Sequence, residues 1–154
     1  MSNVIYARSY AKINLYLDVL RKRPDQFHDI ETIFQSVSLC DELAIEPTSG
    51  TLSLTCTNSQ LDCGATNLVL RAAIALRERT GCTLGAKMVL TKRIPLAAGL
   101  AGGSGNAAAA LFALSQLWNL KRTPEELAAI GLTLGSDVPY CLRGSTMAAR
   151  GRGE

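Results

Sequence analysis

The sequence predicts an α+β domain, with strands in the first half of the chain and helices in the second. Residues 12–20 alternate between apolar and polar side chains, which is the period of a half-buried strand. Beyond residue 67 the apolar side chains recur at helical spacing instead. The chain has 154 residues, about the size of one domain, so a single core is expected.

The predicted strands occupy most of the chain up to residue 56. In the first strand, residues 12–20, the apolar side chains are expected to face the core, while Lys12 and Asn14 lie side by side on the opposite face. A polar loop at residues 21–27 ends this strand. Further strands are predicted over residues 29–39, 41–47 and 51–56, separated by turns at Asp41 and at residues 47–50.

Capping signals indicate where the first two helices begin and end. Asn67 can cap a helix that Gly81 ends, because asparagine is favoured at the start of a helix and glycine just after its last turn. After a strand near residues 88–90, a long alanine-rich segment without helix breakers predicts a second helix that ends near Trp118.

A third helix, over residues 124–134, has the clearest local signals. Thr123 is a suitable N-cap, and Pro124 fits the first helical position. Glu126 can complete a capping box with Thr123. Gly135 ends the helical pattern.

Charge and composition exclude several classes of protein. The formal charge is only +3, and the basic triplet 21–23 has no aromatic residues interleaved with it, which argues against a nucleic-acid partner. The chain has no run of about eighteen apolar residues, and its N-terminus lacks the apolar segment of a signal peptide. We therefore expect a cytoplasmic protein with no membrane partner, while the oligomeric state is not indicated.

The five cysteines do not form a recognisable metal or disulfide pattern. Their number is odd, no CxxC pair occurs, and no histidine lies near them, so neither a zinc site nor a disulfide framework is indicated. We expect reduced packing residues at Cys40, Cys56, Cys63, Cys82 and Cys141.

Residues 94–108, IPLAAGLAGGSGNAA, join a strand to a helix through a turn that is almost free of large side chains. Backbone N–H groups at the start of a helix are unpaired and carry the positive end of the helix dipole, so such a turn can hold a phosphate. No GK[ST] follows, which excludes the Walker pattern, and a GxGxxA match at residues 103–108 lacks the preceding strand and later acidic residue of a dinucleotide site. A tight connection that allows close helix packing remains the alternative.

Four segments carry a resemblance to a known family. PLAAGLAGGSGNAA, from residue 95, resembles the second motif of the GHMP kinases. AKINLYL, from residue 11, RPDQFHDIETIFQ, from residue 23, and GLTLGSDVPYCLRG, from residue 131, resemble the 4-diphosphocytidyl-2-C-methyl-D-erythritol kinase family within it, in the same order. The resemblance covers residues 11–154 and only the N-terminal, ATP-binding domain of the family, whose C-terminal domain is expected to be absent from this chain.

The resemblance implies a two-layer domain in which a mixed sheet packs against helices. It also implies transfer of the γ-phosphoryl group of ATP, with Mg²⁺, to the 2-hydroxyl of 4-diphosphocytidyl-2-C-methyl-D-erythritol, a step of the non-mevalonate isoprenoid pathway. Two alternatives stay open: a GHMP kinase for another small alcohol, and a module that binds nucleotide or RNA without catalysis. The binding module is the less consistent alternative, because the catalytic pair of the family is present in this sequence and a binding module would not need it.

That pair is Lys12 and Asp137. Read alone, Lys12 would be a surface residue of a strand and Asp137 a turn or capping residue. The resemblance implies instead that Asp137 accepts the hydroxyl proton and that Lys12 stabilises the developing alkoxide. It also assigns nucleotide binding to Asn67, Pro95, Leu96, Ala97, Ala98, Gly99, Leu100, Ala101, Gly102, Gly103, Ser104 and Gly105, and names no side chain that binds a metal.

Substrate recognition is implied for Asn14, Phe27, His28 and Phe34. Phe27 can stack on the cytosine and His28 can hydrogen-bond its edge, although a lone loop histidine can also be simply solvated. Phe34 is equally explained by core packing. The chain departs from the family at Gln26, where a glycine is usual, so the loop is expected to run differently. It departs again at Gly105, which replaces a serine whose hydroxyl could contact phosphate or magnesium.

Overall fold

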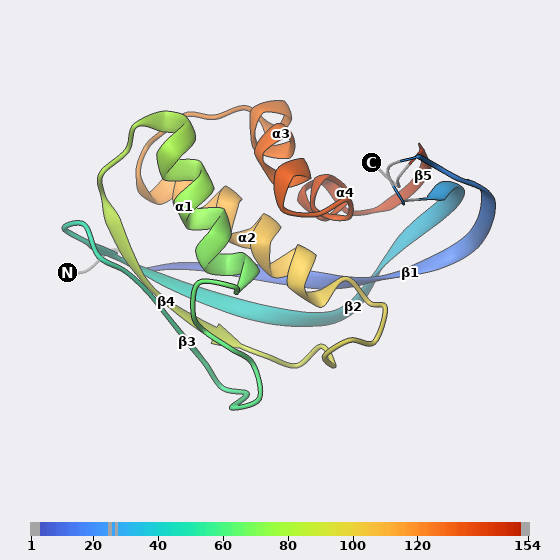
Figure 1. Cartoon of the computed structure of the whole chain (residues 1–154). Coiled ribbons are helices and arrows are strands. Elements are labelled where there is room, and N and C mark those ends of the chain that lie inside the picture. Colours follow the sequence, from blue (N-terminus) through green and yellow to red (C-terminus); the bar gives the residue numbers. More distant parts are fainter. Residues whose placement is uncertain (1–3, 25, 27, 152–154) are drawn as a thin grey trace.

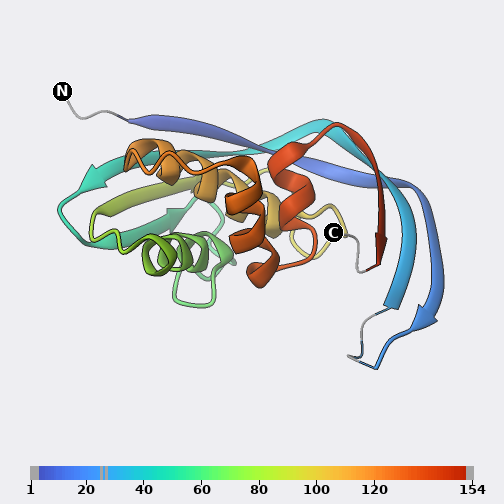
Figure 2. The same ribbon diagram turned by 90° about the horizontal axis from the view of Figure 1, so that it is seen from above.

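A long antiparallel hairpin runs through the whole molecule (Figure 1). Its strands are β1 (Ile5–Lys22) and β2 (His28–Thr48). The structure is a computed structural model that describes residues 4–24, 26 and 28–151. Beyond the helices the hairpin bends away and forms an arm, which includes the turn between β1 and β2 and which Figure 2 shows from above.

The sheet is mixed, as the resemblance predicts. β4 (Gly85–Thr91) pairs with β2 in antiparallel fashion, and β3 (Leu52–Cys56) pairs with β4 in parallel. β5 (Thr146–Gly151) pairs with another part of β2, nearer the arm. β1 is therefore an edge strand, with the order β1-β2-β4-β3 across the main sheet.

The helices cover one face of this sheet (Figures 1 and 2). They are α1 (Leu68–Thr80), α2 (Gly102–Leu117), α3 (Pro124–Leu134) and α4 (Val138–Arg143). Side chains from both layers form the core, including the buried Ile45 and Met88 of the sheet and Leu111 of α2. No helix among the described residues combines the length and the apolar character needed to cross a bilayer.

The capping predictions are confirmed. The Asn67 side chain accepts a hydrogen bond from the Val69 N–H, and Gly81 ends α1 in the left-handed conformation, with a φ of 68°. The capping box of Thr123 and Glu126 forms at the start of α3. These contacts are local, so the sequence alone determines them.

The predicted turn at Asp41 is wrong, because β2 continues through this residue as one strand. The Asp41 carboxylate is fully buried and accepts hydrogen bonds from the N–H groups of Arg93 (2.6 Å) and Ile94 (2.8 Å). It also accepts one from the Lys92 ammonium (2.6 Å). Asp41 thus fixes the chain where β4 ends, instead of ending a strand of its own.

The predicted orientation of β1 is also wrong. The Lys12 residue is only 7% exposed, because its side chain lies on the face that the helices cover. The apolar side chains that were predicted to be buried are exposed instead, at Ile13 (38%), Leu15 (59%), Leu17 (53%) and Val19 (55%). The register shift between Asn14 and Tyr16 breaks the alternation, so these four side chains do not share one face. Alternation along a strand gives two faces but does not say which of them the helices will cover.

Candidate active site

The turn between β4 and α2 holds an unusual backbone conformation. Ala97, Gly99 and Ala101 have positive φ angles of 53°, 72° and 55°. Alanine adopts such angles at a cost, and strained residues of this kind concentrate at functional sites. Ala101 is the N-cap of α2 and carries only a methyl group, so it cannot cap the first N–H groups of the helix as an asparagine or a serine would.

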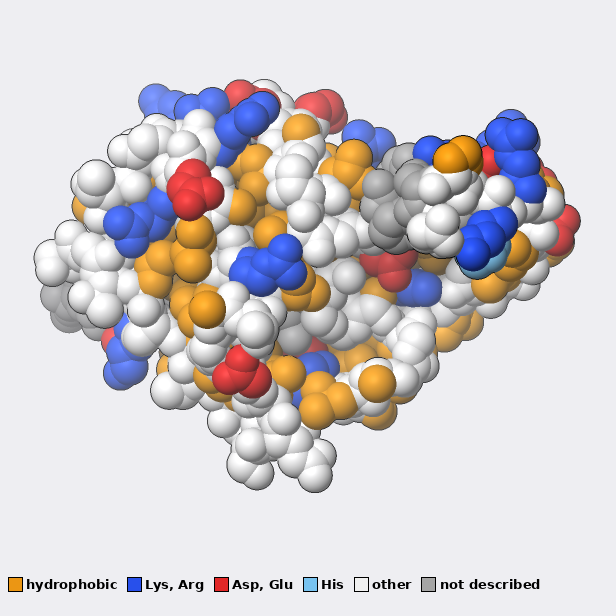
Figure 3. Space-filling view, in the orientation of Figure 1, with side chains coloured by type: hydrophobic (Ala, Val, Ile, Leu, Met, Phe, Trp, Pro, Cys, Tyr) orange, Lys and Arg blue, Asp and Glu red, His pale blue; other side chains and the backbone are white. Residues whose placement is uncertain are grey.

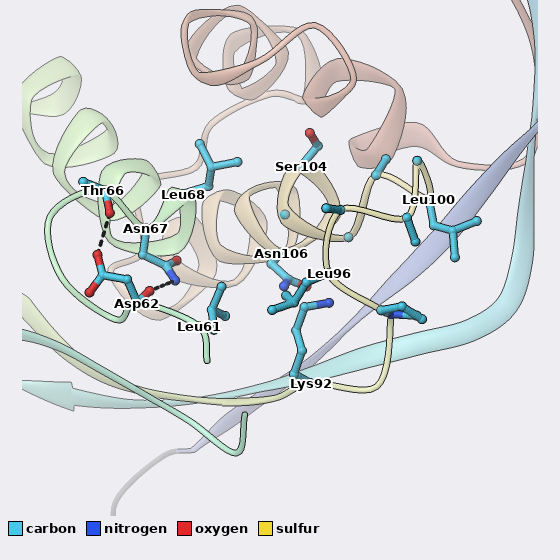
Figure 4. Close-up of a pocket in the computed structure, with 17 residues that line it drawn as sticks. Leu61, Asp62, Thr66, Asn67, Leu68, Lys92, Leu96, Leu100, Ser104 and Asn106 are labelled. Carbon is cyan, nitrogen blue, oxygen red and sulfur yellow. Dashed lines mark hydrogen bonds between the residues drawn. The ribbon is translucent and has the colours of Figure 1, made fainter. Parts of the chain in front are cut away.

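A pocket of about 420 Å³ opens over this turn (Figure 4). Residues 95–104 form one side of it and Asn67 belongs to the other. The structure therefore brings together the residues predicted to bind nucleotide, with the exception of Gly105. A Cβ atom at position 105 would lie 2.5 Å from the Ser9 hydroxyl oxygen, so a side chain there would face β1.

Asn67 also shapes the wall of the pocket. Its amide nitrogen donates to the Asp62 carbonyl (2.6 Å), and its amide oxygen accepts from Val69 N–H (2.9 Å). The Asp62 carboxylate accepts hydrogen bonds from the Thr66 hydroxyl and the Gly64 N–H, which hold the pKa of that carboxyl below its usual value. These bonds order the loop that leads into α1.

Sequence reasoning missed several pocket residues. Leu61, Asp62, Thr66, Leu68, Lys92 and Asn106 also line the pocket. The Lys92 ammonium is buried beneath the turn, where it donates to Asp41 and to the carbonyl of Ile94 (2.6 Å each). Asn106 is 2% exposed, and its amide oxygen has no hydrogen-bond partner among the described residues. An asparagine within a run of alanines was the one available signal for this position.

The second cluster surrounds Lys12. Its ammonium lies 3.8 Å from a carboxylate oxygen of Asp137, the residue that directly precedes α4. The ammonium also donates a hydrogen bond to the Asn14 amide oxygen at 2.9 Å. The ammonium also lies 4.8 Å from the centre of the Phe34 ring. Phe34 is 1% exposed and packs on Tyr140, so it forms the floor beneath Lys12.

One backbone contact joins the two clusters. The Lys12 N–H donates to the carbonyl of Leu100 at 3.1 Å, which ties β1 directly to the glycine-rich turn. The Ser104 hydroxyl lies near the turn before α4, since a Cβ atom at Gly135 would be 3.7 Å from it. The pocket and the pair of Lys12 and Asp137 therefore belong to one site.

Cys141 lies next to this pair but cannot serve as a nucleophile. Burial raises the pKa of its thiol most, and the negative charge of Asp137 raises it as well, against a smaller lowering by the Lys12 charge, so that the pKa is about 12. The thiol is therefore protonated at neutral pH, whereas nucleophilic cysteines react as thiolates.

Of the two residues predicted to read the cytosine, the structure describes His28, which lies on the arm. His28 is exposed at the start of β2, further along the strand from Lys12 than Phe34 is, and Phe27 lies outside the described residues. Beside His28, the carboxylate of Asp29 is held by Arg21 (2.6 Å) and Arg23 (2.8 Å), which lower its pKa. Figure 3 shows basic side chains gathered at this end of the molecule.

Gln26 adopts a φ of 68°, in the left-handed region that glycine enters freely. Its N–H donates to the carbonyl of Arg23 at 3.1 Å, which closes a turn. Gln26, which stands where the family usually has a glycine, thus has a backbone conformation that glycine adopts freely.

The fold and the site define the class of protein to which this chain belongs. The family model of the GHMP kinases N terminal domain matches residues 67–145, about half of the chain, and the chain belongs to this family.

Individual proteins show more specific similarities to this chain. The chain is 51% identical to the 4-diphosphocytidyl-2-C-methyl-D-erythritol kinase of Pelotomaculum thermopropionicum over 98% of its own length and 53% of that protein. It is 47% identical to the enzyme of the same name from Synechococcus sp. strain CC9311 over 100% of its own length and 50% of that protein. A crystal structure of 4-(cytidine 5'-diphospho)-2C-methyl-D-erythritol kinase superposes with a TM-score of 0.83 at 39% identity, covering 97% of this chain and 53% of that one. The chain thus spans about half the length of the curated relatives it matches.

Proposed function

We propose that this chain is the nucleotide-binding part of an ATP-dependent kinase that phosphorylates the 2-hydroxyl of 4-diphosphocytidyl-2-C-methyl-D-erythritol. The observation that carries the proposal is the contact between Lys12 and Leu100, because it joins a bare helix start to an ammonium–carboxylate pair. The names of the two relatives, at 51% and 47% identity, support this choice of substrate.

The phosphates of ATP would lie against the N–H groups at the start of α2. A turn without side chains lets them approach the positive end of the helix dipole. Mg²⁺ is usually held by substrate phosphates, waters and one or two protein oxygens, and it neutralises phosphate charge. The Ser104 hydroxyl is the protein group that would hold it.

Asp137 would accept the proton of the acceptor hydroxyl, and Lys12 would stabilise the oxygen as its charge develops. Asn14 holds the Lys12 ammonium at 2.9 Å and would contact the methylerythritol part of the substrate. Phosphoryl transfer depends mainly on positioning and electrostatic stabilisation, which these side chains supply from rigid elements.

Phe27 and His28 would bind the cytosine, with Phe34 shaping the floor of the site. Two rival functions are a GHMP kinase for another alcohol and a module that binds nucleotide without catalysis. The buried Lys12 beside Asp137 favours an enzyme, because a binding module would gain nothing from confining these two charges.

Calorimetry and an ADP-release assay test the proposal. We expect ATP to bind this chain, and Gly103→Val to weaken binding, because a branched side chain would obstruct the pocket that Gly103 lines. Ala129→Val, at an exposed position of α3, is the matched control. Unchanged affinity in Gly103→Val would argue against the phosphate cradle.

Turnover should require the cytidyl substrate, not mevalonate or homoserine. We expect it to be faint with this chain alone and brisk with the chain extended to the length of its relatives, because the contacts that hold the substrate in line would be incomplete. Turnover with a plain polyol by the extended protein would favour a kinase for another alcohol. Binding of ATP without any turnover by the extended protein would favour the module.

A further inference from the structure

A buried threonine lies behind the Lys12 cluster. Thr32, on β2, is fully buried, and its hydroxyl donates to the carbonyl of Tyr16 on β1 at 2.6 Å. The register of the two strands shifts between Asn14 and Tyr16, so this carbonyl lies beside an irregularity in the ladder. The Thr32 hydroxyl therefore satisfies a backbone acceptor that lies beside this irregularity.

The same hydroxyl accepts a hydrogen bond from the Asn14 amide nitrogen at 2.7 Å. A hydroxyl has one proton, and the Tyr16 carbonyl can only accept, so that proton is committed. Toward Asn14, the Thr32 oxygen can then only accept. The amide of Asn14 must therefore present its NH₂ group to Thr32 and its oxygen to the other side.

On that other side lies Lys12, whose ammonium donates to the Asn14 oxygen at 2.9 Å. The reverse orientation of the amide would place two donors, an NH₂ group and an ammonium, against each other. The chain of hydrogen bonds thus fixes one corner of the Lys12 ammonium. Its remaining protons are free to face Asp137, 3.8 Å away, and an incoming oxygen.

We propose that Thr32 is a positioning residue, which orients Lys12 through Asn14 without touching the substrate. The effect on turnover rests on the proposed function, but the effect on the orientation of Lys12 does not. Thr32→Val has nearly the same volume and removes only the hydroxyl. Thr32→Ser keeps the hydroxyl and is the rescue variant.

The first test uses nuclear magnetic resonance of this chain. We expect Thr32→Val to shift the side-chain signals of both Asn14 and Lys12, with faster solvent exchange of the Asn14 amide protons, and Thr32→Ser to restore them. Thr48→Val is the matched control, because Thr48 lies on the same strand as Thr32 but outside this network. Its hydroxyl donates to the backbone carbonyl of Thr51 at 2.7 Å. Unchanged Asn14 and Lys12 signals in Thr32→Val would overturn the proposal.

The second test uses kinetics of the protein extended to the length of its relatives. We expect Thr32→Val to lower kcat about 10- to 100-fold, because a small misplacement of a catalytic group is costly, with little change in the KM for ATP. Thr32→Ser should stay within about threefold of the unaltered protein on the same reasoning. Thermal melts measured in parallel ensure that only folded protein is compared.

The outcomes separate the two proposals. If the extended protein has no cytidyl-dependent activity, the proposed function fails, and the resonance experiment still decides the role of Thr32. If the signals move but kcat does not, the positioning role is wrong. Should Thr32→Val not fold, Thr32→Cys replaces it, and its weakly donating thiol should change signals and kcat in the same direction by a smaller factor.

Discussion

The Lys12 ammonium lies 3.8 Å from the Asp137 carboxylate, although the two residues come from opposite ends of the chain. This separation exceeds the 2.7–2.9 Å or so of a direct hydrogen bond between ammonium and carboxylate. A substrate hydroxyl placed between the two groups could reach both. The pair therefore resembles a prepared binding site more than a closed ion pair.

Removing the carboxylate should stop proton transfer but not nucleotide binding. In the extended protein we expect Asp137→Asn to lower kcat by about 10² to 10⁴, the loss typical of a positioned base, with ATP affinity nearly unchanged. Lys12→Ala should also act mainly on kcat. Steady-state kinetics and calorimetry measure the two effects, and Glu125→Gln, an exposed carboxylate on α3, is the control. Near-normal turnover of either variant would exclude its catalytic role.

The buried pair of Asp41 and Lys92 should contribute strongly to stability. The Asp41 side chain is fully buried and that of Lys92 is 3% exposed, so Lys92→Met leaves a buried carboxylate without its cation. We expect this variant to lose about 3–5 kcal/mol of unfolding free energy. Adding Asp41→Asn should recover part of the loss, because no buried charge then remains. Urea unfolding gives the free energies.

The neighbouring residue provides the control for this experiment. Arg93 pairs with Glu42 at 3.0 Å, but the side chains are 49% and 38% exposed. Solvent screens such a pair, so Arg93→Ala should change stability little. Equal losses for Lys92→Met and Arg93→Ala would show that burial does not distinguish the two pairs.

Comparison of the fold with the predictions made from the sequence shows which features local sequence can determine. The start of α1 at Asn67 and the capping box of α3 were predicted because each cap depends on residues within one helical turn. The glycine-rich turn was predictable for a similar reason, since a bare helix start is visible in one segment.

Long-range contacts escaped prediction. Asp41 was read as a turn residue because its partners lie on β4 and beyond, far along the chain. Lys92 was overlooked for the same reason. The apolar residues of β1 were assigned to the core because no local signal tells which sheet face the helices will cover.

The arm should become more stable if glycine replaces Gln26. A residue with a side chain pays about 1–2 kcal/mol for a left-handed conformation, and Gln26 has a φ of 68°. We therefore expect Gln26→Gly to raise the unfolding free energy by about 1 kcal/mol, less the entropy that glycine adds to the unfolded chain. Gln26→Ala keeps the Cβ atom and should bring no gain. A loss of stability in Gln26→Gly would show that this backbone conformation carries no strain.

Cys141 should resist alkylation across the neutral range. With a pKa of about 12, its thiol is almost entirely protonated at pH 8, whereas an unfolded cysteine has a pKa of about 8.5. Iodoacetamide should therefore modify Cys141 slowly in the native chain and rapidly in urea, as followed by mass spectrometry. Asp137→Asn should accelerate the native reaction, because the charge of Asp137 raises this pKa. Rapid native modification at pH 8 would contradict the expected protonation.

The exposed apolar side chains of β1 should make this chain self-associate as its concentration rises. Leu15 and Leu17 are 59% and 53% exposed on this strand, and exposed apolar surface favours association. We expect Leu15→Ser combined with Leu17→Ser to lower the weight-average mass measured by light scattering, with ATP affinity unchanged because neither side chain lines the nucleotide pocket. Leu84→Ser, at a position 46% exposed just before β4, removes a similar apolar area outside β1 and should have no such effect. A monodisperse monomer at all concentrations would show that the exposed apolar side chains of β1 do not drive association.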